Sequence, residues 1–115
     1  MKRDQKLYLS DILEAIEKIE KYTKGVSFEG LSQDEQKIDA IVRNFEIIGE
    51  ATKHIFVKTK RKHPEIPWRG MAGMRDKLTH EYFGVNLEIL WKTIKEELPP
   101  VKPSIKKVLK ELSKK

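Results

Sequence analysis

The sequence contains no cysteine, and this absence excludes several kinds of site at once. Disulfide bridges, thiolate nucleophiles and zinc sites built on cysteine are all impossible. A chain without disulfides fits the reducing cytoplasm, which is where we expect the protein to act. Any catalytic chemistry must therefore use other side chains.

Long apolar runs are also missing. Stretches such as Ile55-Phe56-Val57 are only a few residues long, whereas a helix that spans a bilayer needs about 20 apolar residues. Leu7, Leu9 and Ile12 alternate with polar residues after the basic start, so neither a signal peptide nor a membrane partner is expected. A glycine-rich phosphate loop is absent too, so we expect no ATP substrate and no cofactor.

The length and charge of the chain point to one basic domain. With 115 residues and 38% apolar content, the chain is long enough for a single modest core, so residues 1–115 are expected to form one domain. Its 24 Lys and Arg exceed its 18 Asp and Glu, which favours encounter with RNA, DNA or an acidic protein. Much of the excess lies in residues 58–62 and 106–115, where it is also typical of a helix end and a solvated tail.

Apolar periodicity predicts two long helices in the first half. Apolar residues three and four apart predict a helix over residues 4–24, ended by Gly25. Ser32 and Glu35 have the spacing of a capping box, so a second, central helix is expected to begin there. Its apolar period continues to Ile55, and we expect it to fray in the basic cluster before Pro64.

Three further helices are expected in the second half. The third runs from Trp68 or Arg69 to Phe83, the fourth from Leu87 to about Glu97 with Asn86 as its cap, and a short one follows Pro103. No segment has the period of a strand. The predicted fold is therefore all-α, an antiparallel up-and-down helical bundle of four to five helices.

The third predicted helix contains the residues with the most chemical potential. On a continuous helix, Met71, Met74, Leu78 and Tyr82 form the core-facing stripe. Asp76 and His80 lie one turn apart, so the carboxylate can orient the imidazole. Arg75 lies about 140° from His80, so the two meet through the long arginine side chain, a distorted helix end or a second copy of the chain. A cleft between two copies is the simplest of these geometries.

An arginine and a histidine suffice for cleavage of an RNA phosphodiester by its own 2′-hydroxyl. A histidine with a pKa near the usual value of about 6.5 can accept or return the proton, and arginine can stabilise the charged phosphorane oxygens. This reaction needs no metal, and it leaves a 2′,3′-cyclic phosphate and a free 5′-hydroxyl. On spacing alone such a pair is unspecific, because many helices carry one by chance.

Two sequence segments give this pair its significance. The pattern Arg75-x4-His80-x-Tyr82 lies within residues 66–84, IPWRGMAGMRDKLTHEYFG, and the second segment is residues 43–51, RNFEIIGEA. Together they resemble the HepT toxin family of the HEPN superfamily, in helix order and over nearly the whole length. The resemblance implies a homodimeric helical bundle that acts as a metal-independent endoribonuclease toxin of a toxin-antitoxin system.

The same resemblance implies roles for individual residues. Arg75 and His80 would be the catalytic pair, supported by Asp76. Tyr82 would be the residue to which a partner nucleotidyltransferase of the MntA type attaches AMP, which silences the toxin. A nucleotide phosphate at Tyr82 would occupy the RNA path and could pair with Arg75. The alternative for Tyr82 is a tyrosine at the edge of the core.

Other residues are candidates for the edge of the cleft. Arg43, Asn44 and Thr79 could line it, although structural caps and ion pairs are the favoured interpretation for the polar side of the second helix, which carries Arg43 and Asn44. Trp68 is expected to plug the base of the bundle, with base stacking as the alternative. His54 and His63 lack acidic companions at ligand spacing, so they are expected to be exposed and no metal site is predicted.

Two other functions fit the same residues. The helical dimer could be non-catalytic, with Arg75 and His80 binding nucleotide while the chain serves as a docking partner for a nucleotidyltransferase. It could also be a general RNA-binding bundle, whose binding would follow the lysine clusters and weaken with salt. The sequence does not identify the RNA target, because nothing in it resembles a reader of base edges.

Overall fold

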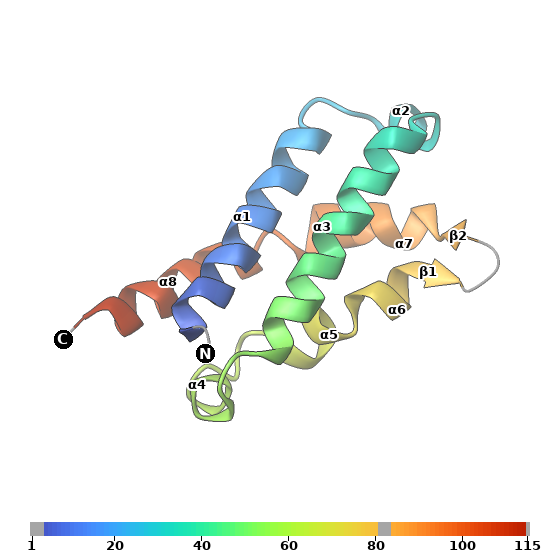
Figure 1. Cartoon of the computed structure of the whole chain (residues 1–115). Helices are drawn as coiled ribbons and strands as arrows, with labels where there is room; N and C mark the ends of the chain where they lie inside the picture. Colours follow the sequence, from blue (N-terminus) through green and yellow to red (C-terminus); the bar gives the residue numbers. More distant parts are fainter. Residues whose placement is uncertain (1–3, 81–83, 115) are drawn as a thin grey trace.

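The computed structural model describes residues 4–80 and 84–114, and for Arg75, Thr79 and His80 it describes the backbone alone. Three long elements form the frame: α1 (Gln5–Thr23), α3 (Glu35–Lys53) and α8 (Val101–Ser113). In Figure 1, α1 and α3 run side by side, and α8 packs on α1. Both ends of the trace lie at the lower left of that view, far from strands β1 and β2 at the right. The all-α prediction is confirmed.

The first long helix begins and ends where the sequence predicts. Asp4 is its N-cap, and its carboxylate accepts a hydrogen bond from the Lys6 amide at 2.9 Å. Gly25 follows its end with a φ of +72°, which glycine adopts without strain. The helix buries one face, formed by Leu9, Ile12, Ile16 and Ile19, against the core.

The predicted start of the central helix is wrong. Residues 28–32 form a short helix, α2 (Phe28–Ser32), in which the Ser32 hydroxyl donates to the carbonyl of Phe28. Asp34 is the N-cap of α3 instead, since its carboxylate accepts from the Lys37 amide at 3.0 Å. Ser32 therefore closes one helix and does not open the next.

The predicted second helix is also two helices. It stops at Lys53, and α4 (Val57–Lys62) follows after an extended residue, Phe56. The amide of Phe56 donates to the side chain of Gln5 at 3.2 Å, so its hydrogen bond is satisfied outside any helix. Ile55 is buried nevertheless, as its place in the apolar period predicts.

The predicted third helix breaks twice. Its residues form α5 (Trp68–Ala72), α6 (Met74–Leu78) and strand β1 (Thr79–His80), which pairs antiparallel with β2 (Gly84–Val85). Gly73 separates the two helices. The helix therefore ends at Leu78, and a small two-stranded hairpin takes the place of its last turn.

The last predicted helices are present with altered detail. Asn86 caps α7 (Leu87–Lys92) through its side-chain oxygen, as expected, and the chain continues as a π-helical turn, η1 (Thr93–Glu97). Helix α8 begins at Val101 rather than after Pro103. Pro103 fits within its first turn, where no amide donor is needed. No helix among the described residues combines the length and apolarity that a membrane crossing requires.

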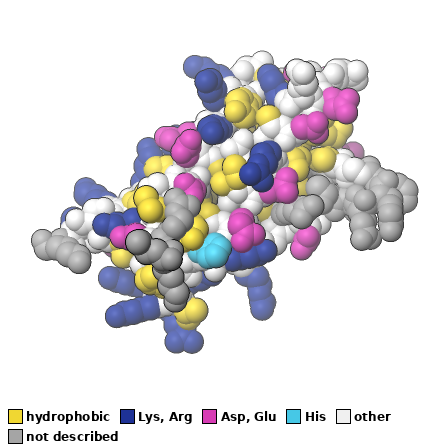
Figure 2. Space-filling model, in the orientation of Figure 1, with side chains coloured by type: hydrophobic (Ala, Val, Ile, Leu, Met, Phe, Trp, Pro, Cys, Tyr) yellow, Lys and Arg dark blue, Asp and Glu magenta, His cyan; other side chains and the backbone are white. Residues whose placement is uncertain are grey.

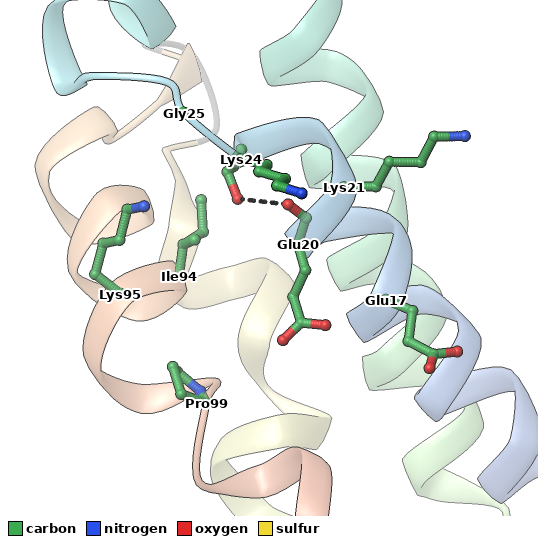
Figure 3. Close-up of a pocket in the computed structure, with 9 residues that line it drawn as sticks. Glu17, Glu20, Lys21, Lys24, Gly25, Ile94, Lys95 and Pro99 are labelled. Carbon is green, nitrogen blue, oxygen red and sulfur yellow. Dashed lines mark hydrogen bonds between the residues drawn. The ribbon is translucent and has the colours of Figure 1, made fainter.

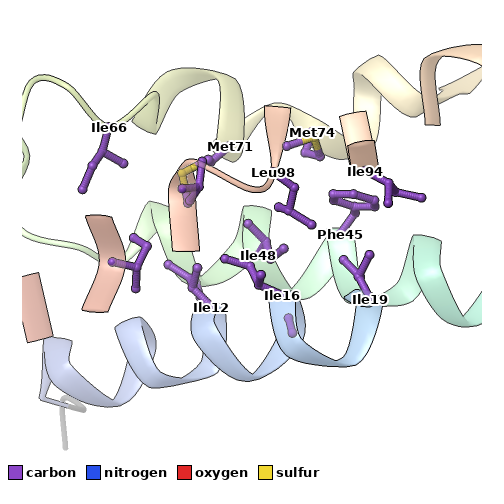
Figure 4. Packing of buried hydrophobic residues seen from close by; sticks show 14 of the residues in the cluster. Ile12, Ile16, Ile19, Phe45, Ile48, Ile66, Met71, Met74, Ile94 and Leu98 are labelled. Carbon is purple, nitrogen blue, oxygen red and sulfur yellow. The ribbon is translucent and has the colours of Figure 1, made fainter. Parts of the chain in front are cut away.

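One core joins these elements. Figure 4 shows α3 between α1 on one side and α5 and α6 on the other, with Phe45 and Ile48 of α3 meeting residues of both. A Cβ on Gly49 would lie 3.3 Å from the backbone carbonyl oxygens of Met71 and Ala72. Helix α5 therefore approaches α3 more closely than a side chain at this position would allow.

The predicted exposure of His63 is wrong. Its side chain is buried, with Nε2 2.9 Å from a carboxylate oxygen of Glu111 and Nδ1 3.5 Å from Glu65. This Glu111 oxygen is buried and receives no well-aligned hydrogen bond from the described residues. His54 is half exposed, as expected; it stacks on Tyr8 with ring centroids 4.6 Å apart.

Candidate functional site

The motif residues lie at the junction between α6 and the hairpin. Arg75 belongs to α6 and His80 ends β1, so the two sit on different elements. The angle of about 140° and the one-turn spacing of Asp76 and His80 both assumed a continuous helix, and that geometry is wrong because the helix ends at Leu78. Arg75 instead lies in a helix and His80 at the end of a strand, on either side of the change from helical to extended backbone after Leu78.

Core packing and an ion pair hold α6 in place. Met74 and Leu78 are buried against the core, and α6 contacts both α3 and α7. Lys77, on another side of the helix, donates to both carboxylate oxygens of Glu97 in η1, at 2.8 and 3.0 Å. The helix that carries Arg75 is therefore attached to the bundle on two sides.

Backbone hydrogen bonds fix the position of His80. In the antiparallel pair of strands, His80 lies opposite Gly84 and Thr79 lies opposite Val85. Beyond these pairs, the Asn86 amide donates to the carbonyl of Leu78 at 2.9 Å, which closes the base of the hairpin. Gly84 has a φ of +78°, a conformation that glycine adopts readily and that helps the chain turn back. His80 is thus held on a short hairpin that leads directly into α7.

The remaining motif positions are only partly within the described structure. Asp76 is exposed, so its carboxylate is available to a neighbouring group or to a ligand. Tyr82 lies outside the described residues, and so do the side chains of Arg75, Thr79 and His80. The structure therefore gives the backbone framework of the candidate site and leaves the predicted contacts among these side chains as predictions.

Arg43 and Asn44 line a different region. Asn44 is buried and donates to the Ala40 carbonyl at 2.8 Å, and it borders a hollow of about 300 Å³ between α1 and α3. Arg43 borders an adjoining hollow of about 200 Å³ with Tyr8 and His54. The described side chains that line these hollows come from α1, from α3 and from His54, and none comes from α6.

Trp68 lies in the core. Its ring is buried and its indole N–H donates to the carbonyl of His63 at 3.0 Å, so its polar atom is satisfied within the protein. This supports the expected role as a plug at the base of the bundle and leaves little ring surface for a nucleic-acid base.

One hollow was not anticipated from the sequence. It has a volume of about 590 Å³ and lies between the end of α1 and η1, bordered by Lys21, Lys24 and Lys95 together with Glu17 and Glu20 (Figure 3). Lys102 of α8 lies 2.8 Å from Glu20, and this hydrogen bond raises the pKa of the lysine. Lysines and glutamates are common on any helix surface, so no sequence signal marks this hollow, and none of the motif residues lines it.

His63, which lies near the carboxylates of Glu65 and Glu111, raises the question of a metal. Among the side chains that the structure describes, which do not include that of His80, no group of three or more His, Asp or Glu is arranged to hold a metal ion. The chemistry available at the helix-to-hairpin junction is that of Arg75, Asp76 and His80, a guanidinium, a carboxylate and an imidazole. These groups can bind a phosphate, stabilise negative charge and transfer a proton.

Comparison with known proteins identifies the family. A family model described as "Ribonuclease HepT-like" matches residues 12–108. The chain is 54% identical over 110 residues to a protein of Thermococcus cleftensis named "Probable ribonuclease HepT", covering 96% of this chain and all of that one. It is 46% identical over 102 residues to a protein of Caldanaerobacter subterraneus named as a putative RNase, covering 89% of this chain and 91% of the relative.

A third relative, also named as a putative RNase, comes from Methanocaldococcus jannaschii. It is 41% identical over 114 residues, which cover 99% of this chain and 98% of the relative. No solved structure matches the chain significantly. The family match includes the whole segment from Arg75 to Asn86, all of α3 and α1 from Ile12 onward. The chain therefore belongs to the HepT-like ribonuclease family.

Proposed function

We propose that this protein is a metal-independent endoribonuclease and the toxin of a toxin-antitoxin pair. The observation that carries the proposal is the family match over residues 12–108, which includes Arg75, Asp76, His80 and Tyr82. The structure supports it by attaching α6 firmly to the bundle and by holding the backbone of His80 in a closed hairpin. The protein acts on RNA in the cytoplasm.

In the proposed reaction the 2′-hydroxyl of the substrate attacks the adjacent phosphorus. His80 accepts the hydroxyl proton or returns a proton to the departing 5′-oxygen, and Arg75 stabilises the charge that develops on the phosphorane oxygens. Asp76 orients one of these two groups. The bond to the 5′-oxygen breaks as the bond to the 2′-oxygen forms, which leaves a 2′,3′-cyclic phosphate and a 5′-hydroxyl.

The test is cleavage of single-stranded RNA by the purified full-length chain. Arg75→Ala and His80→Ala should each lower the rate at least about a hundredfold, since each removes a group that acts in the transition state. Arg69→Ala and His54→Ala are matched controls at exposed positions and should cleave normally. Circular dichroism would verify that all four variants fold.

Substrate chemistry provides an independent readout. A single 2′-deoxy substitution should abolish cleavage at that position, the product should carry a cyclic phosphate, and EDTA should leave the rate unchanged. Wild-type protein that leaves every RNA intact but binds a nucleotidyltransferase would instead favour the non-catalytic docking function. Cleavage that survives in His80→Ala would refute the assigned roles.

We also propose that the active protein is a homodimer with a shared cleft. The support is family membership, because the helical angle that first suggested a dimer does not exist in this fold. Mixing the inactive Arg75→Ala and His80→Ala chains tests it: a cleft built from two copies regains one intact Arg75–His80 pair in each mixed dimer. If activity stays absent while mixed dimers form, both residues of a site belong to one chain.

The proposal also includes the regulation of the toxin by a partner enzyme. A partner nucleotidyltransferase of the MntA type would transfer AMP from ATP to the hydroxyl of Tyr82, forming a phenol–phosphate bond and releasing pyrophosphate. Mass spectrometry after co-expression should find added AMP on Tyr82, and none on Tyr8 or Tyr22. Tyr82→Phe should cleave RNA but resist silencing. A silenced complex with unmodified Tyr82 would contradict this mechanism.

A further inference from the structure

Helix α4 displays a surface that the proposed nuclease chemistry does not use. Two consecutive exposed apolar residues stand at its start: Phe56, the residue just before the helix (55% exposed), and Val57, its first residue (60% exposed). Lys58, Arg61 and Lys62 follow and are exposed as well. We call these five residues the basic-apolar surface. Figure 2 shows Lys and Arg side chains gathered at the lower end of the molecule, near the position of α4, with hydrophobic side chains beside them.

The inner side of α4 is attached to the bundle, which fixes the orientation of the outer side. Thr59 is buried and donates to the side chain of Gln5 in α1 at 3.0 Å, and the same oxygen accepts from the Phe56 amide. On a helix, residues four apart share a face, so Val57 lies beside Arg61 and Lys58 beside Lys62. The surface is therefore preformed, with its apolar part at the start of the helix and its cations one turn further on.

Helix α8 extends the cationic part. His63, directly after α4, lies 2.9 Å from Glu111, so the end of α4 meets the last turns of α8. Lys107 lies four residues before Glu111 in α8, and thus on the same side of that helix, and Lys114 follows directly after the helix end. Both are exposed. The positive charge at this end comes from two helices that are far apart in the sequence.

These cations are available to a ligand. Across the described part of the chain, Lys58, Arg61 and Lys62 form no ion pair within 4.0 Å. Their place near the end of α4 lets them complement the helix dipole, and this role can account for the charges. It does not account for a phenyl ring and an isopropyl group that both remain exposed beside them.

We propose that the basic-apolar surface binds an acidic segment of a protein partner that carries apolar side chains. Charge complementarity selects an acidic ligand, and burial of Phe56 and Val57 requires apolar groups on that ligand. Phe56 offers one ring on which an RNA base could stack, but stacking leaves the aliphatic Val57 beside it uncovered, and two apolar side chains at the start of a six-residue helix provide little area for a membrane. In the bound partner, the apolar and the acidic residues would lie about 5 Å apart, because the apolar part and the cations of the surface are about one turn of α4 apart.

Fluorescence anisotropy with a defined peptide tests the proposal on the full-length chain. The probe is a short labelled peptide with two leucines followed by glutamates, and the comparison peptide has serines in place of the leucines. Wild-type protein should bind the leucine peptide at least about tenfold more tightly than the serine peptide. Phe56→Ser should remove this preference, and Lys62→Glu should weaken the binding of both peptides.

Two matched variants serve as controls. Leu7 of α1 is another large apolar residue, 48% exposed, and Leu7→Ser should keep the preference. Lys95→Glu changes the charge of an exposed lysine in η1 by the same amount and should leave peptide binding nearly unchanged. Because all these positions are exposed, each variant is expected to fold, which circular dichroism would verify.

Several results would overturn the proposal. Phe56→Ser could bind both peptides as the wild type does, which would exclude the apolar part of the surface. Oligouridylate RNA or phosphatidylserine vesicles could bind with the same dependence on Phe56 and more tightly than the leucine peptide, which would assign the surface to RNA or to lipid. Sedimentation could show that Phe56→Ser separates two copies of the chain, which would make the surface a contact between protomers.

Discussion

The pair α1 and α3 differs sharply from the segment between Phe56 and Val85. Each of the two long helices runs for 19 residues without interruption. The segment from Phe56 to Val85 is instead divided into three short helices and a hairpin. Periodic burial stabilises the long pair along its whole length. In the segment, hydrogen bonds from outside the local helix satisfy the backbone at two of the breaks, between Phe56 and Gln5 and between Asn86 and Leu78. The candidate site lies in the second kind of structure and is supported by the first.

The largest predicted effect contrasts two phenylalanines. Phe45 of α3 is fully buried in the core shared by α1, α3 and α6, so Phe45→Ala should lower the free energy of unfolding by about 3–5 kcal/mol. Phe56→Ala, at an exposed position, should change it by no more than about 0.5 kcal/mol. Urea denaturation measures both. If both variants lowered the free energy of unfolding equally, the side chain of Phe56 would not be exposed as described here.

Gly49 tests the contact between the two regions. A Cβ added at Gly49 would lie 3.3 Å from two backbone carbonyl oxygens of the segment that follows α3 in the core. Gly49→Val adds this carbon and two more, so it should lower stability by about 1–3 kcal/mol by pushing α5 away from α3. In Gly70→Ala the new Cβ has its nearest neighbour, in Pro67, at 3.9 Å, so this variant should be neutral or more stable by up to about 1 kcal/mol. Thermal unfolding in the same buffer compares them.

Helix caps provide the same chemical change in both regions. Asp34→Ala and Asn86→Ala each remove a side chain that accepts a backbone N–H, and each should lower stability by about 1 kcal/mol. Only Asn86 directly follows the hairpin, so Asn86→Ala should also slow RNA cleavage, while Asp34→Ala should not. Cleavage rates normalised to folded protein measure the difference, and equal rates would argue against a site at the hairpin.

The smallest predicted effects concern surface ion pairs. Lys77 and Glu97 link α6 to η1 with side chains that are each 43% exposed, so Lys77→Ala should cost no more than about 1 kcal/mol and less in high salt. Lys18→Ala removes the Lys18–Glu14 pair of α1, and should cost about 0.5 kcal/mol or less. A loss in cleavage rate confined to Lys77→Ala would show that the pair positions α6.

The sequence predicts those parts of the fold that depend on local patterns. Apolar periodicity predicts α1, the body of α3 and the α7–η1 stretch, and the cap at Asn86 follows from its residue type and place. The breaks at Phe56 and Leu78 could not be predicted in this way. Leu78 has the apolar spacing of a continuing helix, and its carbonyl is satisfied instead by Asn86, eight residues further on.

For the candidate site, the roles of Arg75, Asp76, His80 and Tyr82 come from the resemblance and stay predictions, although the family match covers their positions. Their predicted arrangement on one helix was wrong because strand pairing of Thr79 and His80 with Gly84 and Val85 replaces the last helical turn. Two-residue strands carry no period, so no pattern in the sequence could have indicated this hairpin.

The position of the two chain ends has a practical consequence. Both lie at the end of the molecule opposite the hairpin (Figure 1). An affinity tag, a fluorophore or a linker to a sensor chip attached at either end would therefore lie away from the hairpin. Single-molecule recordings on immobilised protein are therefore compatible with attachment at either terminus.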